Sequence, residues 1–237
     1  MAADLGAAAG SFTWPTPITA RPYTIGLWFY PTSAAANMYI WAIGNSGTGN
    51  NQYAVRSVSA QWRLMIADAN PDYADGGTLT VNKWHYIVAR FISNGNARMH
   101  VLEYNGVITN ILNSSGRNQA TPNRMGLGHA VESSGGSSGQ GMAAEFFYTN
   151  TDIQADGGVL SPSTLRQLAF RGPWSIPHIA KDIIEYHSLR KDYLNDMVPV
   201  KFGLRAWAQT GTVKVGQHPP LAAGYVQSKD FIQNIPM

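Results

Sequence analysis

The sequence predicts an all-β protein, a sandwich of antiparallel strands with one short helix and a C-terminal extension. Apolar residues recur at every second position in several segments of strand length, which is the period of strands with one buried face. Clusters of Gly, Asn, Pro and Ser separate these segments at short spacing, and helical periodicity is nearly absent. Many short strands with turn signals favour an antiparallel sandwich over parallel βαβ units.

The expected strands follow one another as far as Thr149. They are Ser11–Trp14, Tyr23–Tyr30, Met38–Ile43, Gln52–Val58, Gln61–Ala67, Thr78–Val81, Trp84–Ile92, Ala97–Glu103, Val107–Leu112, Arg124–His129 and Met142–Thr149. In the segment 23–30 the odd-numbered residues are expected to share one face, with Trp28 and Tyr30 on the other. Asn105-Gly106 between two apolar runs predicts a tight hairpin, because such turns need positive φ at their central residues.

The character of the chain changes after the last of these strands. Ser161 before Pro162 is typical of a helix start, and apolar residues follow at helical spacing, so a helix is expected over 160–168. The segment Ile179–Leu189 fits either a last strand or a short amphipathic helix. Residues 190–237 hold few apolar runs of strand length. The expected division is a sandwich over residues 1–189 and an arm over 190–237 that packs on the sandwich or on neighbouring subunits.

Composition narrows the classes of function. Charged residues make up 13% of the chain, about half the usual ~25%, which indicates either a surface covered by partner chains or one of neutral polar residues. The net charge is +3, but Lys and Arg are scattered, which argues against nucleic-acid binding. Cysteine is absent, so disulfides and thiolate chemistry are excluded. The chain has no apolar stretch long enough to span a membrane, and Met1–Gly10 lacks signal-peptide features.

Acidic residues do not form a hydrolase pattern. Retaining glycosidases need two carboxylates about 5–5.5 Å apart, usually from alternate positions of one strand. The glutamates are isolated from one another: Glu103, Glu132, Glu145 and Glu185. The histidines show no spacing typical of zinc ligands, and His85 is expected to be a surface residue or a hydrogen-bonded core residue. The sequence therefore predicts a protein that is not an enzyme and has no bound cofactor, unless it binds calcium.

One segment has oxygen-bearing side chains at spacings that suggest calcium. The candidate ligands are Asp68, Asn70, Asp72 and Asp75. The glycine and glutamate of a calcium-binding loop are absent, since Tyr73 and Leu79 stand in their places. Asp, Asn and Pro are also typical of an ordinary strand connection. The sequence therefore does not decide between a turn and a calcium site in this segment.

Candidate interface residues lie in the flanking segments rather than in the strands. They are Trp174, Trp207, His218 and Phe231. Large aromatic side chains outside a core commonly anchor protein interfaces. Trp28, Trp62 and Trp84 lie within or beside strands and are expected in the core.

Several of these segments resemble a known family. Pro22–Pro31 (PYTIGLWFYP) and Lys83–Ala89 (KWHYIVA) resemble two strands of the laminin G-like, concanavalin A-like jelly rolls. Ala97–Val107 resembles the hairpin that follows, and Ala144–Tyr148 with Leu160–Leu168 resembles a later strand and helix. Departures from the pattern are Asn105 for an aspartate and Thr164-Leu165 for a Glu-Ile pair. The resemblance implies an antiparallel jelly-roll sandwich over roughly residues 20–170.

The C-terminal part resembles the variant of this family found in tailed-bacteriophage virion proteins, through Ile183–Leu189 and Thr210–Pro219. That resemblance implies a non-enzymatic capsid decoration (cement) protein on the outside of the virion. Its partners would be the major capsid protein and copies of itself, for instance as a trimer. The alternative is a carbohydrate- or receptor-binding module of a head or tail fibre that binds host-surface glycans. Neither hypothesis involves nucleic acid or a membrane.

Overall fold

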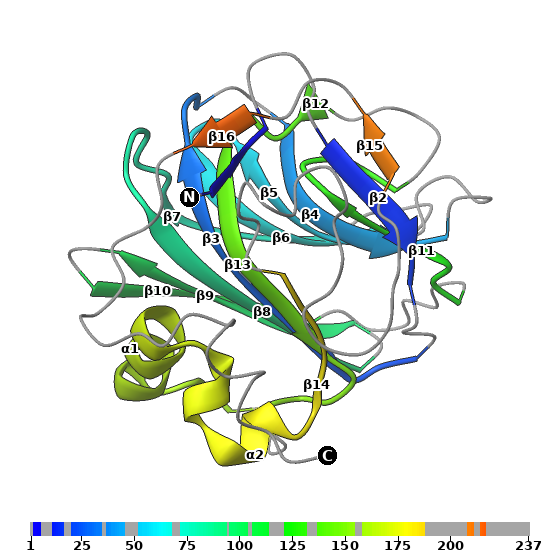
Figure 1. The fold of residues 1–237 in the computed structure, drawn as a ribbon, viewed down its shortest axis with the longest axis vertical. Coiled ribbons are helices and arrows are strands. Elements are labelled where there is room, and N and C mark those ends of the chain that lie inside the picture. The colour runs from blue at the N-terminus through cyan, green and yellow to red at the C-terminus, as the bar shows by residue number, and fades with distance from the viewer. Residues whose placement is uncertain are drawn as a thin grey trace.

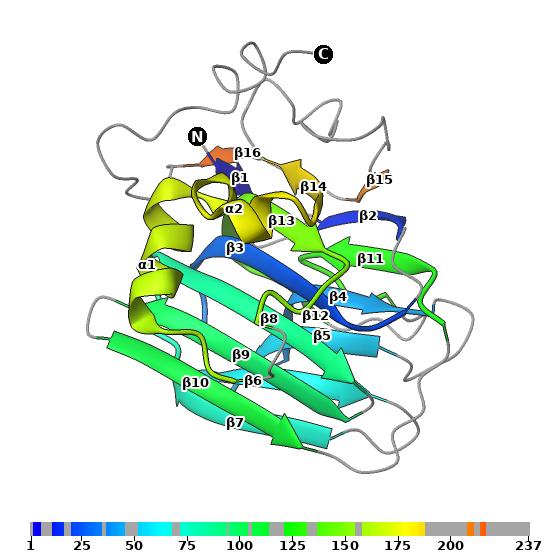
Figure 2. The same ribbon diagram turned by 90° about the horizontal axis from the view of Figure 1, so that it is seen from below.

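The computed structural model describes most of the sandwich and little of the C-terminal extension. The described residues are 2–5, 11–16, 20–34, 37–45, 52–67, 72–93, 95–103, 106–113, 121–131, 137–154, 158–187, 208–210 and 214–216. They form two sheets that pack face to face, with short helices beside one of them (Figures 1 and 2). This confirms the predicted all-β sandwich.

The first sheet, sheet A, runs in the order β10-β9-β8-β3-β13-β1-β16, and β14 pairs with β13 beside β1. Its strands are β1 (Ala2–Asp4), β3 (Tyr23–Pro31), β8 (His85–Ser93), β9 (Asn96–Glu103), β10 (Gly106–Asn113), β13 (Gly141–Thr149), β14 (Ile183–His187) and β16 (Lys214–Gly216). All its pairs are antiparallel. The predicted hairpin is confirmed, with Glu103 opposite Gly106.

The second sheet, sheet B, runs in the order β15-β2-β11-β4-β5-β6-β7. Its strands are β2 (Ser11–Pro15), β4 (Met38–Gly44), β5 (Gln52–Val58), β6 (Gln61–Ala67), β7 (Asp72–Thr78), β11 (Arg124–Leu127), β12 (Ser137–Ser138) and β15 (Ala208–Thr210). The pairs along this order are antiparallel, and β12 adds one short parallel pair to β4.

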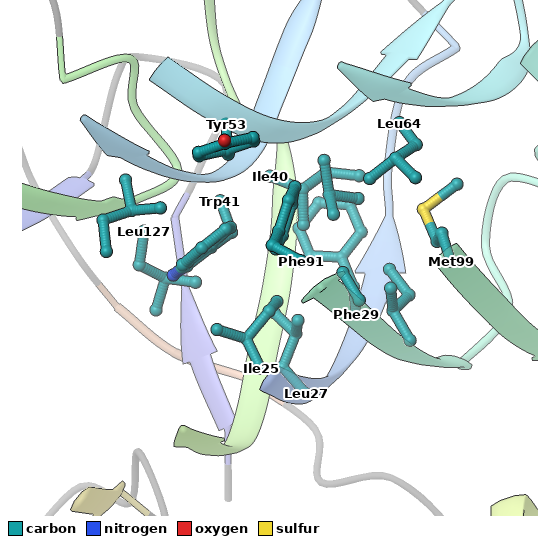
Figure 3. Packing of buried hydrophobic residues seen from close by; sticks show 14 of the residues in the cluster. Ile25, Leu27, Phe29, Ile40, Trp41, Tyr53, Leu64, Phe91, Met99 and Leu127 are labelled. Atoms are coloured by element: carbon teal, nitrogen blue, oxygen red, sulfur yellow. The ribbon is translucent and has the colours of Figure 1, made fainter. Parts of the chain in front are cut away.

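The main core fills the space between the two sheets (Figure 3). As the period of the strand predicts, Ile25, Leu27 and Phe29 of β3 point into it. Tyr23 lies between rings of both layers, with its ring centroid 5.1 Å from that of Phe91 and 5.9 Å from that of Tyr53. Interlocking aromatic and branched side chains of this kind supply most of the apolar burial of a sandwich.

A second apolar cluster covers the outer face of sheet A. Here α1 (Pro162–Arg171), the 3-10 helix η1 (Pro173–Ser175) and α2 (Pro177–Ala180) bury Leu165, Leu168 and Ile179 against the sheet. On the sheet side the cluster includes Trp28, whose indole N–H donates to the carbonyl of Ala169 over 3.0 Å. None of the helices in the described ranges has the length and apolar content needed to cross a membrane.

The predicted helix start is confirmed, and two other predictions change. Ser161 Oγ accepts a hydrogen bond from Thr164 N over 3.1 Å, so it caps α1. The strand predicted over Thr78–Val81 is wrong, because the strand of this region is β7, which ends at Thr78. The segment 179–189 contains both alternatives in sequence: α2 ends at Ala180 and β14 begins at Ile183.

The free edges of the two sheets meet where β10 of sheet A lies against β7 of sheet B. Asn110 is buried there, and its Nδ2 lies 3.2 Å from the carbonyl oxygens of both Trp62 and Ala74. A Cβ at Gly76 would lie 2.6 Å from Asn110 Oδ1, so the glycine lets the two edges approach. This contact holds β7 in a sheet although its residues are typical of a turn.

Candidate functional site

The outer face of sheet B carries polar side chains on neighbouring strands. Val55, Leu64 and Ala74 point into the core, so the residues next to them point outward. Strand pairing aligns these outward residues into one row across β4, β5, β6 and β7: Tyr39, Arg56, Arg63 and Asp75. We call these residues the outer row.

Arg63 and Asp75 form one end of the outer row. The guanidinium meets the carboxylate through two parallel hydrogen bonds, from Nε to Oδ1 and from Nη2 to Oδ2, each 2.5 Å long. The hydrogen bond to Asp75 is the main cause that raises the pKa of Arg63. The guanidinium carbon also lies 4.1 Å from the ring centroid of Tyr73, whose side chain is 42% exposed. This end therefore offers an aromatic ring and an ion pair to solvent.

Arg56 and Tyr39 form the other end. The guanidinium carbon of Arg56 lies 4.4 Å from the ring centroid of Tyr39, a cation–π contact. Its Nη2 donates to Asn37 Oδ1 over 2.9 Å, and its Nη1 lies 3.2 Å from the sulfur of Met65. Both of these partners are neutral, in contrast to the carboxylate that Arg63 binds.

Buried neighbours hold the Tyr39 ring in place. Gln52 donates from Nε2 to the Tyr39 hydroxyl over 3.0 Å, and its Oε1 accepts from the backbone N–H of Val131 over 3.3 Å. Ala42 and Ala54 pack beneath Val131 in the same small apolar cluster. Ala130 and Val131 thus cover the outer face of sheet B as far as Ala54 and Met65, which are buried. Beyond them, Arg56 and Arg63 are partly exposed, and Tyr73 and Asp75 are exposed.

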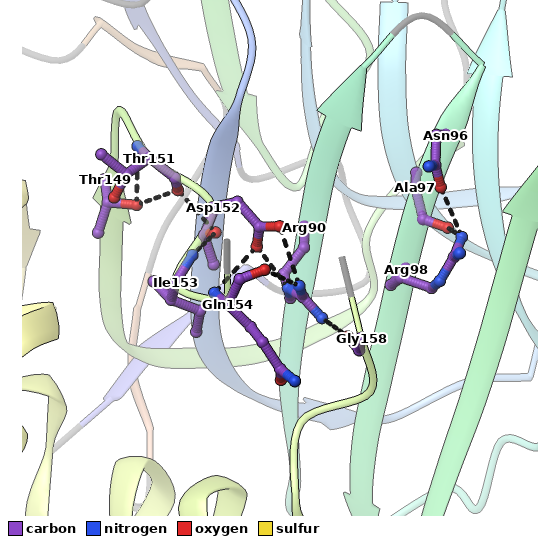
Figure 4. Close-up of polar contacts among 11 residues, drawn as sticks. Arg90, Asn96, Ala97, Arg98, Thr149, Thr151, Asp152, Ile153, Gln154 and Gly158 are labelled. Carbon is purple, nitrogen blue, oxygen red and sulfur yellow. Dashed lines mark hydrogen bonds and ion pairs between the residues drawn. The ribbon is translucent and has the colours of Figure 1, made fainter. Parts of the chain in front are cut away.

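The outer face of sheet A holds a buried ionic network instead (Figure 4). Arg90 donates to Asp152 through Nε, over 2.7 Å, and through Nη2, over 3.0 Å. Its remaining donors reach the carbonyl oxygens of Gln154 and Gly158. The Arg90 side chain is fully buried and that of Asp152 is 5% exposed. This network anchors Asp152, Gln154 and Gly158 to β8.

Several strands of sheet A carry buried histidines. Burial, followed by the nearby charges of Arg90 and Arg98, lowers the pKa of His100 to about 4. Burial also lowers the pKa of His187, against the opposing effect of Glu185, whose Oε2 lies 3.3 Å from the His187 Nε2. These side chains therefore stay neutral in the folded protein at neutral pH.

His85 is a hydrogen-bonded core residue, one of the two roles predicted for it. Its Nε2 lies 2.8 Å from the Thr80 carbonyl oxygen, and its Nδ1 lies 3.2 Å from Glu103 Oε1. The same carboxylate oxygen accepts from the indole N–H of Trp62 over 3.4 Å. Burial lowers the pKa of His85 more than Glu103 raises it. Trp28 and Trp62 are buried as predicted, and Trp84 packs partly exposed beside Trp28.

Two of the predicted calcium ligands can be located. Asp72 and Asp75 both lie in β7, but three positions apart in a regular strand, so their carboxylates point to opposite faces of sheet B. Asp68 and Asn70 lie outside the described residues. Within the described ranges, no group of three or more His, Asp or Glu side chains is arranged to hold a metal ion. A calcium site built from all of these ligands stays a prediction, and β7 does not bring Asp72 and Asp75 together.

Of the predicted interface residues, Trp174 is described. It is half-buried, and its ring packs edge-on against Tyr186 with centroids 5.7 Å apart. Part of its surface therefore serves the packing of η1 on sheet A. Trp207, His218 and Phe231 lie outside the described residues. A role of these side chains in an interface stays a prediction.

The described strands form a jelly-roll sandwich, and part of the outer face of sheet B carries partly exposed polar side chains. The family model of the concanavalin A-like lectin/glucanases superfamily matches residues 6–146. The chain belongs to this superfamily. No match to a curated protein was found.

Solved structures share the fold at low sequence identity. A heptameric SAP-like pentraxin from Limulus polyphemus is 12% identical, with a TM-score of 0.59 over 91% of this chain and 94% of that chain. Domain 4 of AbnA, an extracellular arabinanase of Geobacillus stearothermophilus solved in complex with arabinotriose, is 16% identical. Its TM-score is 0.52 over 71% of this chain and 76% of that chain.

A phage protein also shares the fold. The enzymatically active domain of tailspike protein 2 from bacteriophage CBA120 is 13% identical, with a TM-score of 0.53. The match covers 75% of this chain and 28% of the tailspike chain, so it corresponds to a minor part of that protein.

Proposed function

We propose that this chain is a non-enzymatic carbohydrate-binding module that attaches a phage head or tail fibre to host-surface glycans. The observation that carries the proposal is the outer row together with Tyr73. An exposed aromatic ring offers a stacking surface for the apolar side of a sugar ring. The neighbouring Arg and Asp side chains offer charge-assisted hydrogen bonds to its hydroxyl groups.

Two comparisons support this reading. The superfamily of the chain includes lectins by its description, and one structure of the same fold was solved with a bound arabinose trisaccharide. The proposal that a phage carries this module is supported by the fold that the chain shares with a tailspike domain. Both arguments are analogies from the fold, and the residues of the outer row are the argument from this chain itself.

Removal of the Tyr73 ring tests this site. The full chain is first applied to a glycan array, and the best ligand is measured by calorimetry. We expect Tyr73→Ala to weaken binding at least about tenfold, or about 1.4 kcal/mol, because an exposed stacking surface is lost. The matched control is Ile111→Ala, since Ile111 is 48% exposed on the outer face of sheet A. If the chain binds no glycan on the array, the proposed function is contradicted. If Tyr73→Ala and Ile111→Ala lower the affinity for the glycan equally, the binding site does not include Tyr73.

The capsid decoration role stays a prediction. The arm that would contact capsid subunits lies mostly outside the described residues, and the sandwich offers no observation that favours this role over glycan binding. A cryo-EM map of the particle distinguishes the two. A few copies on a fibre would support the proposal, and one copy beside every capsid subunit would contradict it.

A further inference from the structure

The positive charge of Arg56 is a feature of the outer row that packing does not explain. Arg56 lies directly opposite Arg63 in the β5–β6 pair. Like charges placed directly opposite each other destabilise a sheet. Asp75 compensates the charge of Arg63. In the part of the chain that the structure describes, no carboxylate lies within ion-pair distance of Arg56.

The hydrogen-bonding capacity of Arg56 is also only partly used. A guanidinium has five N–H donors. One terminal nitrogen contacts the Met65 thioether, which is a weak acceptor, and the other donates to the side chain of Asn37. The buried Nε has no acceptor among the described residues. In contrast to Arg90, this partly exposed guanidinium keeps donors for a further acceptor.

The guanidinium is held in one orientation before any ligand arrives. Tyr39 is 4% exposed, and Gln52 fixes its hydroxyl, so the ring is a rigid platform under the Arg56 side chain. A planar guanidinium that is already oriented binds carboxylates well, because two parallel N–H groups match the two carboxylate oxygens. Less side-chain entropy is lost on binding when the receptor is ordered beforehand.

We infer that the outer row binds acidic saccharides, with the carboxylate of a uronate or sialate unit paired to Arg56 and a neighbouring sugar ring stacked on Tyr73. Strands β5 and β7 are two positions apart, about 10 Å in the hydrogen-bonding direction. A short oligosaccharide rather than a single sugar therefore spans both groups. This inference rests on the proposed function and narrows its ligand class.

The test compares saccharides that differ only in charge. An array carries oligosaccharides with uronate or sialate units beside the same compounds after reduction of each carboxyl group to an alcohol. The full chain is expected to prefer the acidic form at least tenfold, and added salt should reduce that preference. Arg56→Gln should abolish the preference. Arg56→Lys should retain part of it, because the charge remains while the planar fork is lost.

The control is Arg166→Gln, an exposed arginine on α1 that should leave the preference unchanged. Thermal unfolding of each variant shows whether it is folded. Equal affinity of the native chain for both forms overturns the inference and leaves the proposed function standing. A preference that survives in folded Arg56→Gln overturns it as well. Failure to bind either form contradicts the proposed function itself.

Discussion

The outer faces of the two sheets carry arginines in opposite situations. On sheet A, Arg90 is fully buried and donates to Asp152 and to two backbone carbonyls. On sheet B, Arg56 is partly exposed, with two neutral partners and an aromatic ring. Helices, Asp152–Gln154 and Gly158 lie against the first face, whereas the arginines of the outer row on the second face are partly exposed.

This difference separates residues that hold the fold from residues that are available to a ligand. A buried charge must be paired, because an unpaired one costs several kcal/mol, so the Arg90 network belongs to the architecture. Partly exposed charges contribute little to stability. The outer row is therefore poorly explained by folding, and binding is the better explanation for its two arginines.

The largest effect is expected from breaking the buried pair. Asp152→Ala leaves the Arg90 guanidinium buried without its carboxylate, and we expect it to lower the free energy of unfolding by about 3–5 kcal/mol. Urea denaturation followed by tryptophan fluorescence measures this. A loss under about 1 kcal/mol would show that the covered face does not depend on the pair. Glycan binding of the folded variant should persist.

The second-largest effect on stability is expected from acidification, through His100 on sheet A. The pKa of His100 is about 4 in the folded chain and close to 6.5 when exposed. The unfolded state therefore binds the extra proton first, and stability falls as the pH drops from about 6.5 to about 4. The difference corresponds to about 3 kcal/mol. Urea denaturation at several pH values should show a shallower pH dependence for His100→Gln.

Other histidines limit how far the His100 substitution can flatten the dependence of stability on pH. The pKa values of His85, His129 and His187 are also lowered, with burial as the largest cause, so the remaining dependence has the same sign. The control variant is His178→Gln, which replaces an exposed histidine of α2. An unchanged profile in His100→Gln would contradict the role of His100.

The smallest effect on stability is expected from removing an ion pair on the outer face of sheet B. Asp75→Ala removes an ion pair in which the side chains of Arg63 and Asp75 are 18% and 36% exposed. It should lower the free energy of unfolding by less than about 1 kcal/mol. It also removes the negative charge of the outer row, and this gain for an acidic saccharide should outweigh the loss of one acceptor for a sugar hydroxyl, so the affinity should rise several-fold. Scanning calorimetry measures the stability of the variant, and titration calorimetry measures its affinity for the saccharide. A loss of stability well above about 1 kcal/mol would contradict this expectation.

The strands could be predicted where local pattern and tertiary contacts agree. Strands β5 and β6 begin and end at the predicted residues, because apolar alternation is regular in both. Strand β7 was not predicted, since Asp72–Thr78 has the composition of a turn. It forms a strand because β6 pairs with it and because Asn110 from the other sheet donates to its carbonyl oxygens. Such contacts between distant segments override local preference.

The outer row could not be predicted for a related reason. Its members are far apart in the sequence, and the pairing register of neighbouring strands brings them together. The available signal was an arginine at an outward position in each of two consecutive strands, at 56 and 63. The predicted candidates concentrated instead on one acidic loop and on flanking aromatics. Asp75 belongs to both sets, first as a proposed metal ligand and then as the partner of Arg63.

The short strands at the two ends of the chain determine how much of it is needed as a folding unit. Strand β16 pairs with β1, and β15 pairs with β2, so residues beyond 200 complete one edge of each sheet. A chain cut at residue 189 would keep the pairs of β1 with β13 and of β2 with β11, but the backbone N–H and C=O groups on the other edge of β1 and β2 would lose their strand partners. Exposed edges of this kind recruit strands from other molecules. We therefore expect β15 and β16 to protect these two edges from pairing with other chains.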